Sequence, residues 1–282
     1  MSKVGIDNWT YYNHAAIPTT APHETPDMSP IKDGSIWKMG GGGTPYLVRW
    51  TTNFDCSHET EWWYCIKDTP FDISKIKAKR RYIINQGIKN FDVKVINPED
   101  YKNQLYEIQI SAFSAYPEKY RPYVDEKAFK QSIDEWKNSV VFGAFYRETA
   151  ELCGYSILNE NEDWVGFSVQ KTNPAFEKYQ INAALVYGIL ERYNEKLGSN
   201  FYICDGARNI LHETAFQEYL ERYFGFRKAY CKLNLFYRKP VGVAVALLMP
   251  FRKFLNGFDG VSFIHKINGV LQMHAIFKSS LN

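Results

Sequence analysis

The sequence predicts an α/β fold in which helices flank a mixed, mostly antiparallel central sheet, with an irregular region before it and a helical tail after it. Three observations support this prediction. Between residues 91 and 238, segments with alternating apolar residues take turns with segments that have an apolar residue at every third or fourth position. Three of these strands follow one another across short polar turns, which favours antiparallel pairing. A later pair of strands is joined through a helix, as parallel neighbours are.

The composition is that of an ordinary globular protein. Of 282 residues, 45% are hydrophobic, which is enough for one large or two modest domains. The 34 basic and 31 acidic residues leave a net charge of +3, which does not indicate DNA as a partner. Five cysteines include no Cys-x-x-Cys pair, so we expect neither a metal site nor a disulfide framework. Without a signal-peptide pattern or an apolar run of about 18 residues, we expect a cytoplasmic protein.

Residues 1–90 are expected to form an N-terminal arm or partial domain. The first 45 or so are rich in Pro, Thr, His and Gly, which predicts long loops. Strands are predicted over 46–50 and 61–66, and the second combines a carboxylate with three aromatic rings. Glu61 and Trp63 are therefore candidate contacts to a sugar or an amine, although tryptophans on a strand are more often buried against a neighbouring sheet.

The main domain is predicted over residues 91–239. Its elements are, in order, a strand over 91–96, a helix capped near Asn97, a tyrosine-rich loop over 116–123, a helix over 125–136, a hairpin of strands over 140–146 and 152–158, and a third strand over 164–169. Before it, a helix over 73–85 carries the basic run 75–81, which is either a solvated face or a phosphate contact.

A crossover follows the third strand. A polar turn over 170–174 precedes a helix with apolar residues at Ile181, Leu185, Ile189 and Tyr193, and the next strand spans 201–204. Parallel strands joined in this way leave backbone N–H groups free at the first turn of the helix, where α/β folds tend to hold phosphates.

Several motifs carry a resemblance to a known superfamily. They are Lys79-Arg80-Arg81-Tyr82-x-Ile84-x-x-Gly87, Asp205-Gly206-x-Arg208, the block from His212 to Leu220, and Gly225-Phe226 between the last helix and the last strand. With the order of the elements, they resemble the Gcn5-related N-acetyltransferase (GNAT) superfamily, and more closely its Fem-like acyltransferase branch. That branch includes aminoacyl transferases of peptidoglycan synthesis and sugar acyltransferases of envelope polysaccharides. The chain departs from the superfamily at the phosphate turn, since residues 170–183 contain no glycine.

The resemblance implies a donor site for acetyl-CoA or another acyl-CoA. The strand and the helix after it would supply its contacts: Phe167, Ser168, Val169, Gln170, Lys171, Lys178, Tyr179, Gln180, Ile181 and Asn182. The strand would pair with the amide-bearing arm of the thioester, and the helix start would hold the pyrophosphate.

Acyl transfer needs a base for the acceptor and a proton for the leaving thiolate. His212 is the candidate base, with Asp205 and Glu213 to orient it, and Tyr219 is the candidate acid, because the superfamily's usual tyrosine position is occupied by Glu221. An alternative for the same block is helix capping by Thr214. A buried apolar role is expected for Cys204.

Tyr116, Tyr120 and Arg121, together with Glu61 and Trp63, are the candidate acceptor contacts. The expected activity is transfer of an acyl group to an amine or hydroxyl of a sugar or cell-envelope precursor. Two alternatives stay open: aminoacyl-tRNA as the donor, and a catalytically degenerate binding module.

Residues 240–282 form an amphipathic tail. An apolar run over 241–249 precedes a second amphipathic segment over 261–277, with basic residues between them. The tail is expected to pack across the domain, to form a homodimer contact, or to lie peripherally on a membrane surface.

Overall fold

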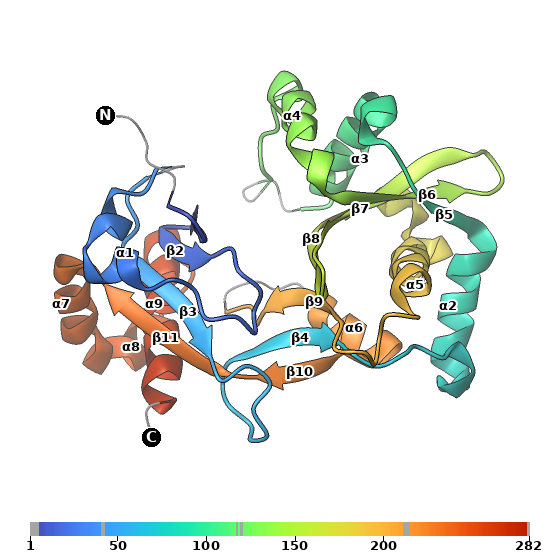
Figure 1. Cartoon of the computed structure of the whole chain (residues 1–282). Helices are drawn as coiled ribbons and strands as arrows, with labels where there is room; N and C mark the ends of the chain where they lie inside the picture. The colour runs from blue at the N-terminus through green and yellow to red at the C-terminus, as the bar shows by residue number, and fades with distance from the viewer. Residues whose placement is uncertain (1–5, 41–42, 117, 119–120, 211–214, 281–282) are drawn as a thin grey trace. The chain divides into compact units, whose positions relative to one another are not determined.

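The computed structural model describes residues 6–40, 43–116, 118, 121–210 and 215–280 (Figure 1). Its contacts divide the chain into two compact units. The first comprises 1–64, 207–214 and 228–282, and the second comprises 65–206 and 215–227. This grouping is not linear along the chain, whereas the division expected from the sequence at residues 90 and 239 is. The chain passes from one unit to the other within strands β4 (Trp63–Lys67), β9 (Tyr202–Ala207) and β10 (Arg227–Tyr230).

The second unit contains the predicted alternation of strands and helices. Its elements are η2 (Ile73–Lys75), α2 (Ala78–Asn90), β5 (Phe91–Val95), η3 (Pro98–Tyr101), α3 (Lys102–Ser114), α4 (Glu126–Ser132), η5 (Ile133–Asn138), β6 (Val140–Tyr146), β7 (Glu151–Glu160), β8 (Trp164–Thr172), η6 (Pro174–Tyr179), α5 (Ile181–Tyr193), β9 and α6 (Phe216–Phe224). The η elements are 3₁₀ turns.

The seven-stranded sheet, whose strands β5 to β8 lie in this unit, confirms the predicted fold class. Its strand order is β10-β4-β9-β8-β7-β6-β5. Strands β5 to β8 pair antiparallel with their neighbours, and β8 pairs parallel with β9. The predicted hairpin turns through residues 147–150, where Ala150 has a φ of 58°, and the predicted third strand extends to Thr172 rather than ending at Val169.

Helix α5 is the centre of the core in this unit. Eight of its 13 residues are buried, among them Ile181, Leu185 and Ile189 at the predicted spacing. Helix α2 crosses it closely at Gly87, where an added Cβ would lie 2.7 Å from the carbonyl oxygen of Gln180 and 2.8 Å from the amide nitrogen of Ala184. Part of the Lys79 to Gly87 motif therefore serves this helix crossing, because only glycine leaves room for the facing backbone.

The Gly225-Phe226 pair ends α6 as predicted. Gly225 has a φ of 68°, in the left-handed region that favours glycine. The amides of Gly225 and Phe226 both donate to the carbonyl of Leu220 near the end of the helix. Phe226 is only 4% exposed, so its ring fills the core directly after the turn.

The first unit is built on a four-stranded sheet of order β1-β2-β3-β11. Its elements are β1 (Trp9–Tyr12), β2 (Ala15–Pro18), α1 (Ser29–Lys32), η1 (Ser35–Lys38), β3 (Leu47–Thr52), β11 (Lys232–Tyr237), α7 (Lys239–Leu248), η7 (Met249–Phe251), α8 (Arg252–Asn256) and α9 (Ser262–Ser279). The region expected to be irregular thus holds two short strands among its loops. Asn13 and His14, both at positive φ, form the tight turn between them.

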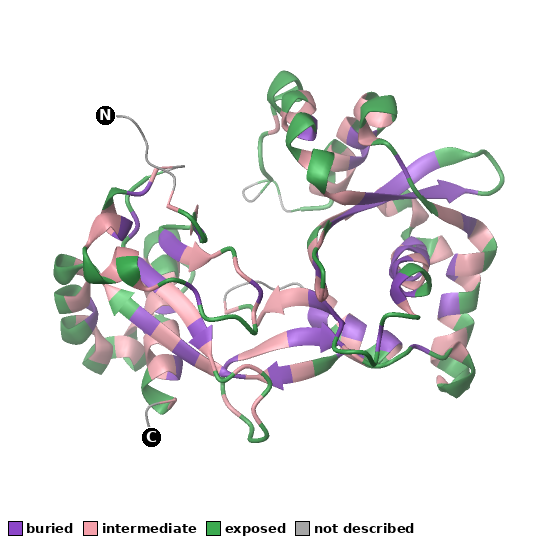
Figure 2. Ribbon diagram, viewed as in Figure 1, coloured by how far each residue is buried: buried purple, intermediate pink, exposed green. Residues whose placement is uncertain are grey.

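The tail is helical, as predicted, and its last helix packs on the first unit. Ile276 lies in a cluster with Leu47, Trp62 and Leu235, and Met273 and Phe277 pack against it. Helices α7 and α8 are largely exposed, as Figure 2 shows. Within the described residues, no helix combines the length and the apolar character needed to cross a bilayer.

Candidate functional site

Strand β8 is paired along one edge and only partly along the other. Its ladder with β9 joins Trp164–Gly166 to Tyr202–Cys204, and among the described residues it goes no further. The β7 ladder shifts register at the same height, since Ile157 faces Val169 and Leu158 faces Phe167. Ser168 is the extra residue of this bulge and is exposed. A bulge turns backbone groups out of the ladder, and within the described residues no strand pairs with the β9 side of β8 after Gly166.

Three polar side chains fix β8 to the start of α5. The Ser156 hydroxyl donates to Gln170 Oε1 at 2.8 Å, and Gln170 Nε2 donates to Asn182 Oδ1 at 2.9 Å. Ser156 is fully buried. Gln170 and Asn182, both predicted contacts of the acyl donor, therefore hold each other in place. The edge of β8 offers a ligand its backbone groups rather than these side chains.

Lys171 points toward helix α3. Its ammonium lies 4.6 Å from the ring centroid of Phe113 and 6.0 Å from that of Tyr116, and partial burial lowers its pKa. Lys171, a predicted contact of the acyl donor, thus lies beside Tyr116, a predicted contact of the acyl acceptor. Phe113 was not among the predicted site residues, because its position in α3 reads as core.

The first turn of α5 retains free donors. Gln180 precedes it in the left-handed conformation and its side chain makes no capping hydrogen bond. The amides of Ile181 and Asn182 belong to the first turn, which lacks intrahelical acceptors. Lys178 is exposed, with its ammonium 4.9 Å from the Tyr179 ring centroid. These five predicted contacts lie on one short segment.

Asp205 lies on β9 directly after its ladder with β8 ends, and is partly buried. Burial raises its pKa to about 7, although a hydrogen bond from Gln217 lowers it in part. The residue that follows, Gly206, has a φ of 88°, which a side chain would strain. A carboxyl group with a pKa near neutrality can both accept and release a proton under ordinary conditions.

Helix α6 brings aromatic and amide groups to this carboxyl. Gln217 is 5% exposed, and its Nε2 donates to the backbone carbonyl of Asp205 at 3.5 Å. The Phe216 ring lies 6.1 Å from that of Phe167 on β8, and Tyr219 stacks on Phe216 at the same distance. Burial, and then the neighbouring Tyr223, raise the pKa of Tyr219, so this phenol keeps its proton. Phe167, Asp205 and Tyr219 are thus connected through α6.

Part of the predicted machinery lies outside the described residues. His212, Glu213 and Thr214 precede α6, and Tyr120 belongs to the tyrosine-rich loop. Their predicted roles stay predictions.

The predicted acceptor contacts are divided between the units. Tyr116 and Arg121 belong to the second, where Arg121 Nη2 donates to the carbonyl of Ser114 at 2.9 Å. Glu61 and Trp63 belong to the first. There the Arg208 guanidinium donates to the Glu61 carbonyl at 2.6 Å, and Lys228 lies 4.9 Å from the Trp63 ring centroid.

Cys204 is a core residue, as expected. It is 2% exposed, and burial raises the pKa of its thiol to about 12, so it holds no thiolate at neutral pH. No group of three or more His, Cys, Asp or Glu side chains in the described chain is arranged to hold a metal ion.

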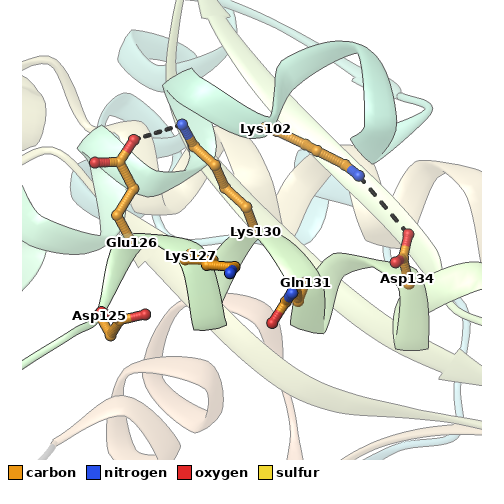
Figure 3. A pocket seen from close by; sticks show the side chains of 7 residues that line it. All are labelled: Lys102, Asp125, Glu126, Lys127, Lys130, Gln131 and Asp134. Atoms are coloured by element: carbon orange, nitrogen blue, oxygen red, sulfur yellow. Dashed lines mark hydrogen bonds and ion pairs between the residues drawn. The ribbon is translucent and has the colours of Figure 1, made fainter.

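Two surface hollows lie in the second unit, and neither is lined by β8 or β9. One, of about 530 Å³, is bordered by charged residues of α3, α4 and η5, where Lys130 pairs with Glu126 and Lys102 with Asp134 (Figure 3). The other, of about 520 Å³, surrounds Phe71.

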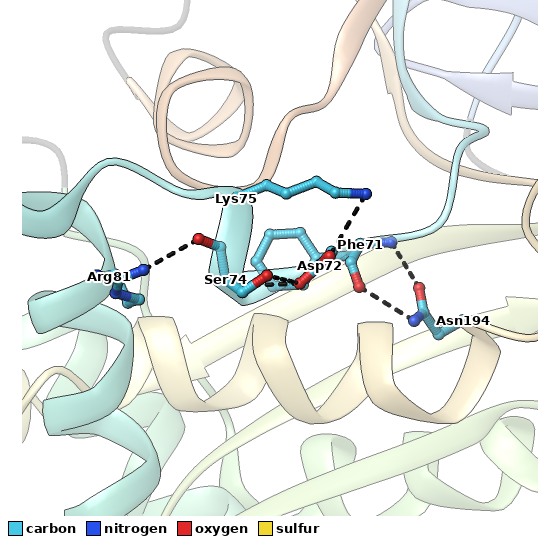
Figure 4. A network of polar contacts seen from close by, with 6 residues as sticks. All are labelled: Phe71, Asp72, Ser74, Lys75, Arg81 and Asn194. Carbon is cyan, nitrogen blue, oxygen red and sulfur yellow. Dashed lines mark hydrogen bonds and ion pairs between the residues drawn. The ribbon is translucent and has the colours of Figure 1, made fainter.

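A polar network beside the second hollow fastens the chain around Phe71. The Asn194 amide makes two hydrogen bonds with the backbone of Phe71, and the Arg81 guanidinium donates to the Ser74 carbonyl (Figure 4). Because the polar groups of these residues are hydrogen-bonded to one another, we assign the residues a structural role. Arg81, from the predicted basic run, is thereby given a structural partner.

Gln217 is a further site residue that the sequence did not single out. Its side chain donates to the backbone carbonyl of Asp205, whereas Thr214, the predicted capping residue, lies outside the described residues. The signal available in the sequence was its neighbourhood: an amide inside a helix whose other residues are largely aromatic or charged.

No family model and no curated protein matches the chain. Similar solved structures include L-PGS from Bacillus licheniformis, which is 15% identical with a TM-score of 0.47, over 82% of this chain and 80% of that one. The C-terminal domain of a proposed lysylphosphatidylglycerol synthetase from Agrobacterium fabrum is 9% identical with a TM-score of 0.49, over 86% and 84%. FemX is 10% identical with a TM-score of 0.46, over 64% and 62%. At these identities the likeness concerns the fold alone.

Proposed function

We propose that the second unit transfers an acyl group from a coenzyme A thioester to an amine or hydroxyl acceptor. The observation that carries this proposal is the end of the β8–β9 ladder after Gly166, beside a carboxyl group whose pKa burial raises to about 7. The unpaired peptide groups of residues 167–170 would pair with the amides of the pantetheine arm as an added strand. In this arrangement the thioester carbonyl would lie near Asp205.

Asp205 would act as the base and Tyr219 as the acid. The acceptor nitrogen attacks the thioester carbonyl and gives its proton to Asp205; the new C–N bond forms as the C–S bond breaks, and the leaving thiolate takes a proton from Tyr219. Asp205 suits the role of base because its pKa lies near neutrality, and Tyr219 enters the reaction protonated, as an acid must. His212 and Glu213 stay in the proposal as a second base and its orienting group.

The donor phosphates would lie at the first turn of α5, near the amides of Ile181 and Asn182, with Lys178 as counter-charge. The aromatic loop that includes Tyr116, Tyr120 and Arg121 would contact the acceptor, for which a sugar or cell-envelope precursor is proposed.

One observation favours aminoacyl-tRNA as a second candidate donor. Lys77 and Lys79 are exposed at the start of α2, and Arg80 is half-buried. A cluster of basic residues at a helix start suits an RNA phosphate backbone.

Thermal unfolding with and without acetyl-CoA tests the proposal. A binder at a free ligand concentration about 100 times its Kd is stabilised by about 2.7 kcal/mol, so we expect a higher melting temperature at millimolar acetyl-CoA. The same shift is expected for Asp205→Asn, which keeps the β8 edge, and for the control Glu162→Gln, an exposed carboxylate before β8.

Absence of any shift with acetyl-CoA would contradict the proposed donor. A steeply salt-dependent shift with charged tRNA, and none with acetyl-CoA, would replace it with the second candidate. Binding without turnover on any amine would instead identify a degenerate binding module.

A further inference from the structure

The outer face of the tail helices exposes large apolar side chains at helical spacing. From Lys239 to Asn256, α7, η7 and α8 follow one another without a break. Four exposed residues recur along them at intervals of four, four and three positions, namely Val243, Leu247, Phe251 and Phe254, and Phe258 follows four positions later in the turn after α8. Such spacing places side chains along one face of a helix. The Phe254 and Phe258 rings lie 5.1 Å apart. With Phe263 at the start of α9, these residues are here named the tail patch.

The exposure of the tail patch is unusual for this chain. Leu247 and Phe254 are each 67% exposed, and Phe263 is 72% exposed. Of the 15 large hydrophobic side chains that are exposed in the described chain, seven fall within residues 243–263. Val245, on the opposite side of α7, is 5% exposed. Helix α7 is therefore apolar toward its own unit and also toward the outside, which is typical of a surface that a partner covers.

The charge around the tail patch is almost entirely positive. Residues 238–282 hold six of the chain's 34 basic residues and one of its 31 acidic residues. The single carboxylate, Asp259, is hydrogen-bonded by the Asn268 amide at 2.7 Å and by the His265 ring at 2.8 Å. These bonds hold its pKa below the usual range, with Asn268 the larger cause. Arg252 and Lys253 lie between the exposed phenylalanines.

We propose that the tail patch docks on a membrane surface that contains anionic lipids. The phenylalanines would enter the boundary between headgroups and acyl chains, and the basic residues would contact lipid phosphates. Charge decides between this occupant and a second copy of the chain. A two-fold contact places the same surface on both sides, so it would bring two basic segments together.

Co-sedimentation of the full chain with lipid vesicles tests the proposal. We expect the chain to bind vesicles of phosphatidylcholine with one third phosphatidylglycerol, and to bind phosphatidylcholine alone more weakly. Replacing both Phe254→Ser and Phe263→Ser should weaken the apparent vesicle affinity by more than about tenfold. Replacing both Arg252→Gln and Lys253→Gln should weaken it by about fivefold for each residue, and only at low salt.

The matched control replaces two tyrosines that are exposed to a similar degree elsewhere, Tyr12→Ser and Tyr82→Ser, and should bind as the unchanged chain does. Circular dichroism would verify that each variant is folded. The proposal is overturned if the unchanged chain stays in solution, if the control weakens binding as much as the patch variant, or if sedimentation reveals a dimer that the patch variant dissociates in the absence of lipid. None of these readouts depends on acyl transfer.

Discussion

The two units depart from the usual distribution of side chains in opposite ways. In the second unit a carboxyl group, Asp205, is largely withdrawn from water beside the free edge of β8. In the first unit the tail patch leaves large rings in water. Both arrangements oppose stability, because a desolvated carboxylate and exposed apolar area each raise the free energy of the folded chain.

This contrast separates two kinds of function. A buried polar group or an exposed apolar patch is more informative than the many residues that follow the rule. The proposed role of the partly buried carboxyl is proton transfer, whereas the proposed role of the exposed rings is docking on a surface that removes them from water.

The largest effect is expected for Asp205→Asn on acyl transfer. A positioned base contributes about 10²- to 10⁴-fold, so the rate constant should fall by at least about 100-fold at pH 8 with the fold intact. The unchanged chain should show a rate that rises with pH through about 7, where Asp205 loses its proton. A pH–rate profile of both proteins provides the measurement. Retention of the rising limb in Asp205→Asn would assign the base to another residue, of which His212 is the candidate.

The stability of the chain should depend on pH through the same carboxyl. Its pKa is about 7 when folded and 3.8 as the reference value, so between these pH values only the folded state holds the proton. The free energy of unfolding should therefore fall, on the order of 1 to 4 kcal/mol, as pH rises from about 4 to about 7. Urea unfolding at pH 5 and pH 8 measures this difference. Asp205→Asn should lose that part of the slope and Glu162→Gln should keep it; identical slopes in all three proteins would argue against a desolvated carboxyl.

Gly87→Ala tests the close crossing of α2 and the start of α5, where the donor phosphates are proposed to bind. An added methyl would stand 2.7 Å from the Gln180 carbonyl oxygen, and overpacking of this kind typically costs about 1 to 3 kcal/mol. Denaturant unfolding gives the change. As a control, Gly260→Ala has open space around its Cβ position and ordinary φ, so it should be nearly neutral. A neutral Gly87→Ala would mean that the helices separate easily.

The smallest effect is expected for Phe254→Ser on stability. Its ring is 67% exposed, and exposed substitutions usually change the free energy of unfolding by less than about 0.5 kcal/mol. Thermal unfolding without lipid measures this change. A loss of several kcal/mol would show that the ring supports the fold. Phe254 would then no longer count as a docking residue of the tail patch.

Local patterns were enough to predict most of the second unit. The apolar run over 140–146 matches β6 in both bounds, and the apolar spacing of α5 identified its buried face, because both signals lie within the segment itself. The first unit was harder to predict. Strand β3 pairs with β11, so Leu47 faces Tyr237, and no local pattern reveals a partner so far along the chain.

The candidate site was only partly accessible from the sequence. Asp205 was named, but as a residue that orients His212, because the sequence does not show that burial raises its own pKa. Lys171 was assigned to phosphates, whereas its ammonium lies over the Phe113 ring. Both roles depend on neighbours from other elements, which spacing along the chain does not specify.

Backbone amide chemical shifts during a coenzyme A titration test the central claim most directly. If the free edge of β8 receives the pantetheine arm, the amides of Phe167, Ser168 and Val169 should shift most, and that of Ser168 should exchange more slowly with solvent. Strand β6, paired on both edges, should change little. Shifts that leave residues 167–169 unchanged at saturating coenzyme A would contradict the assignment of this edge as the donor site.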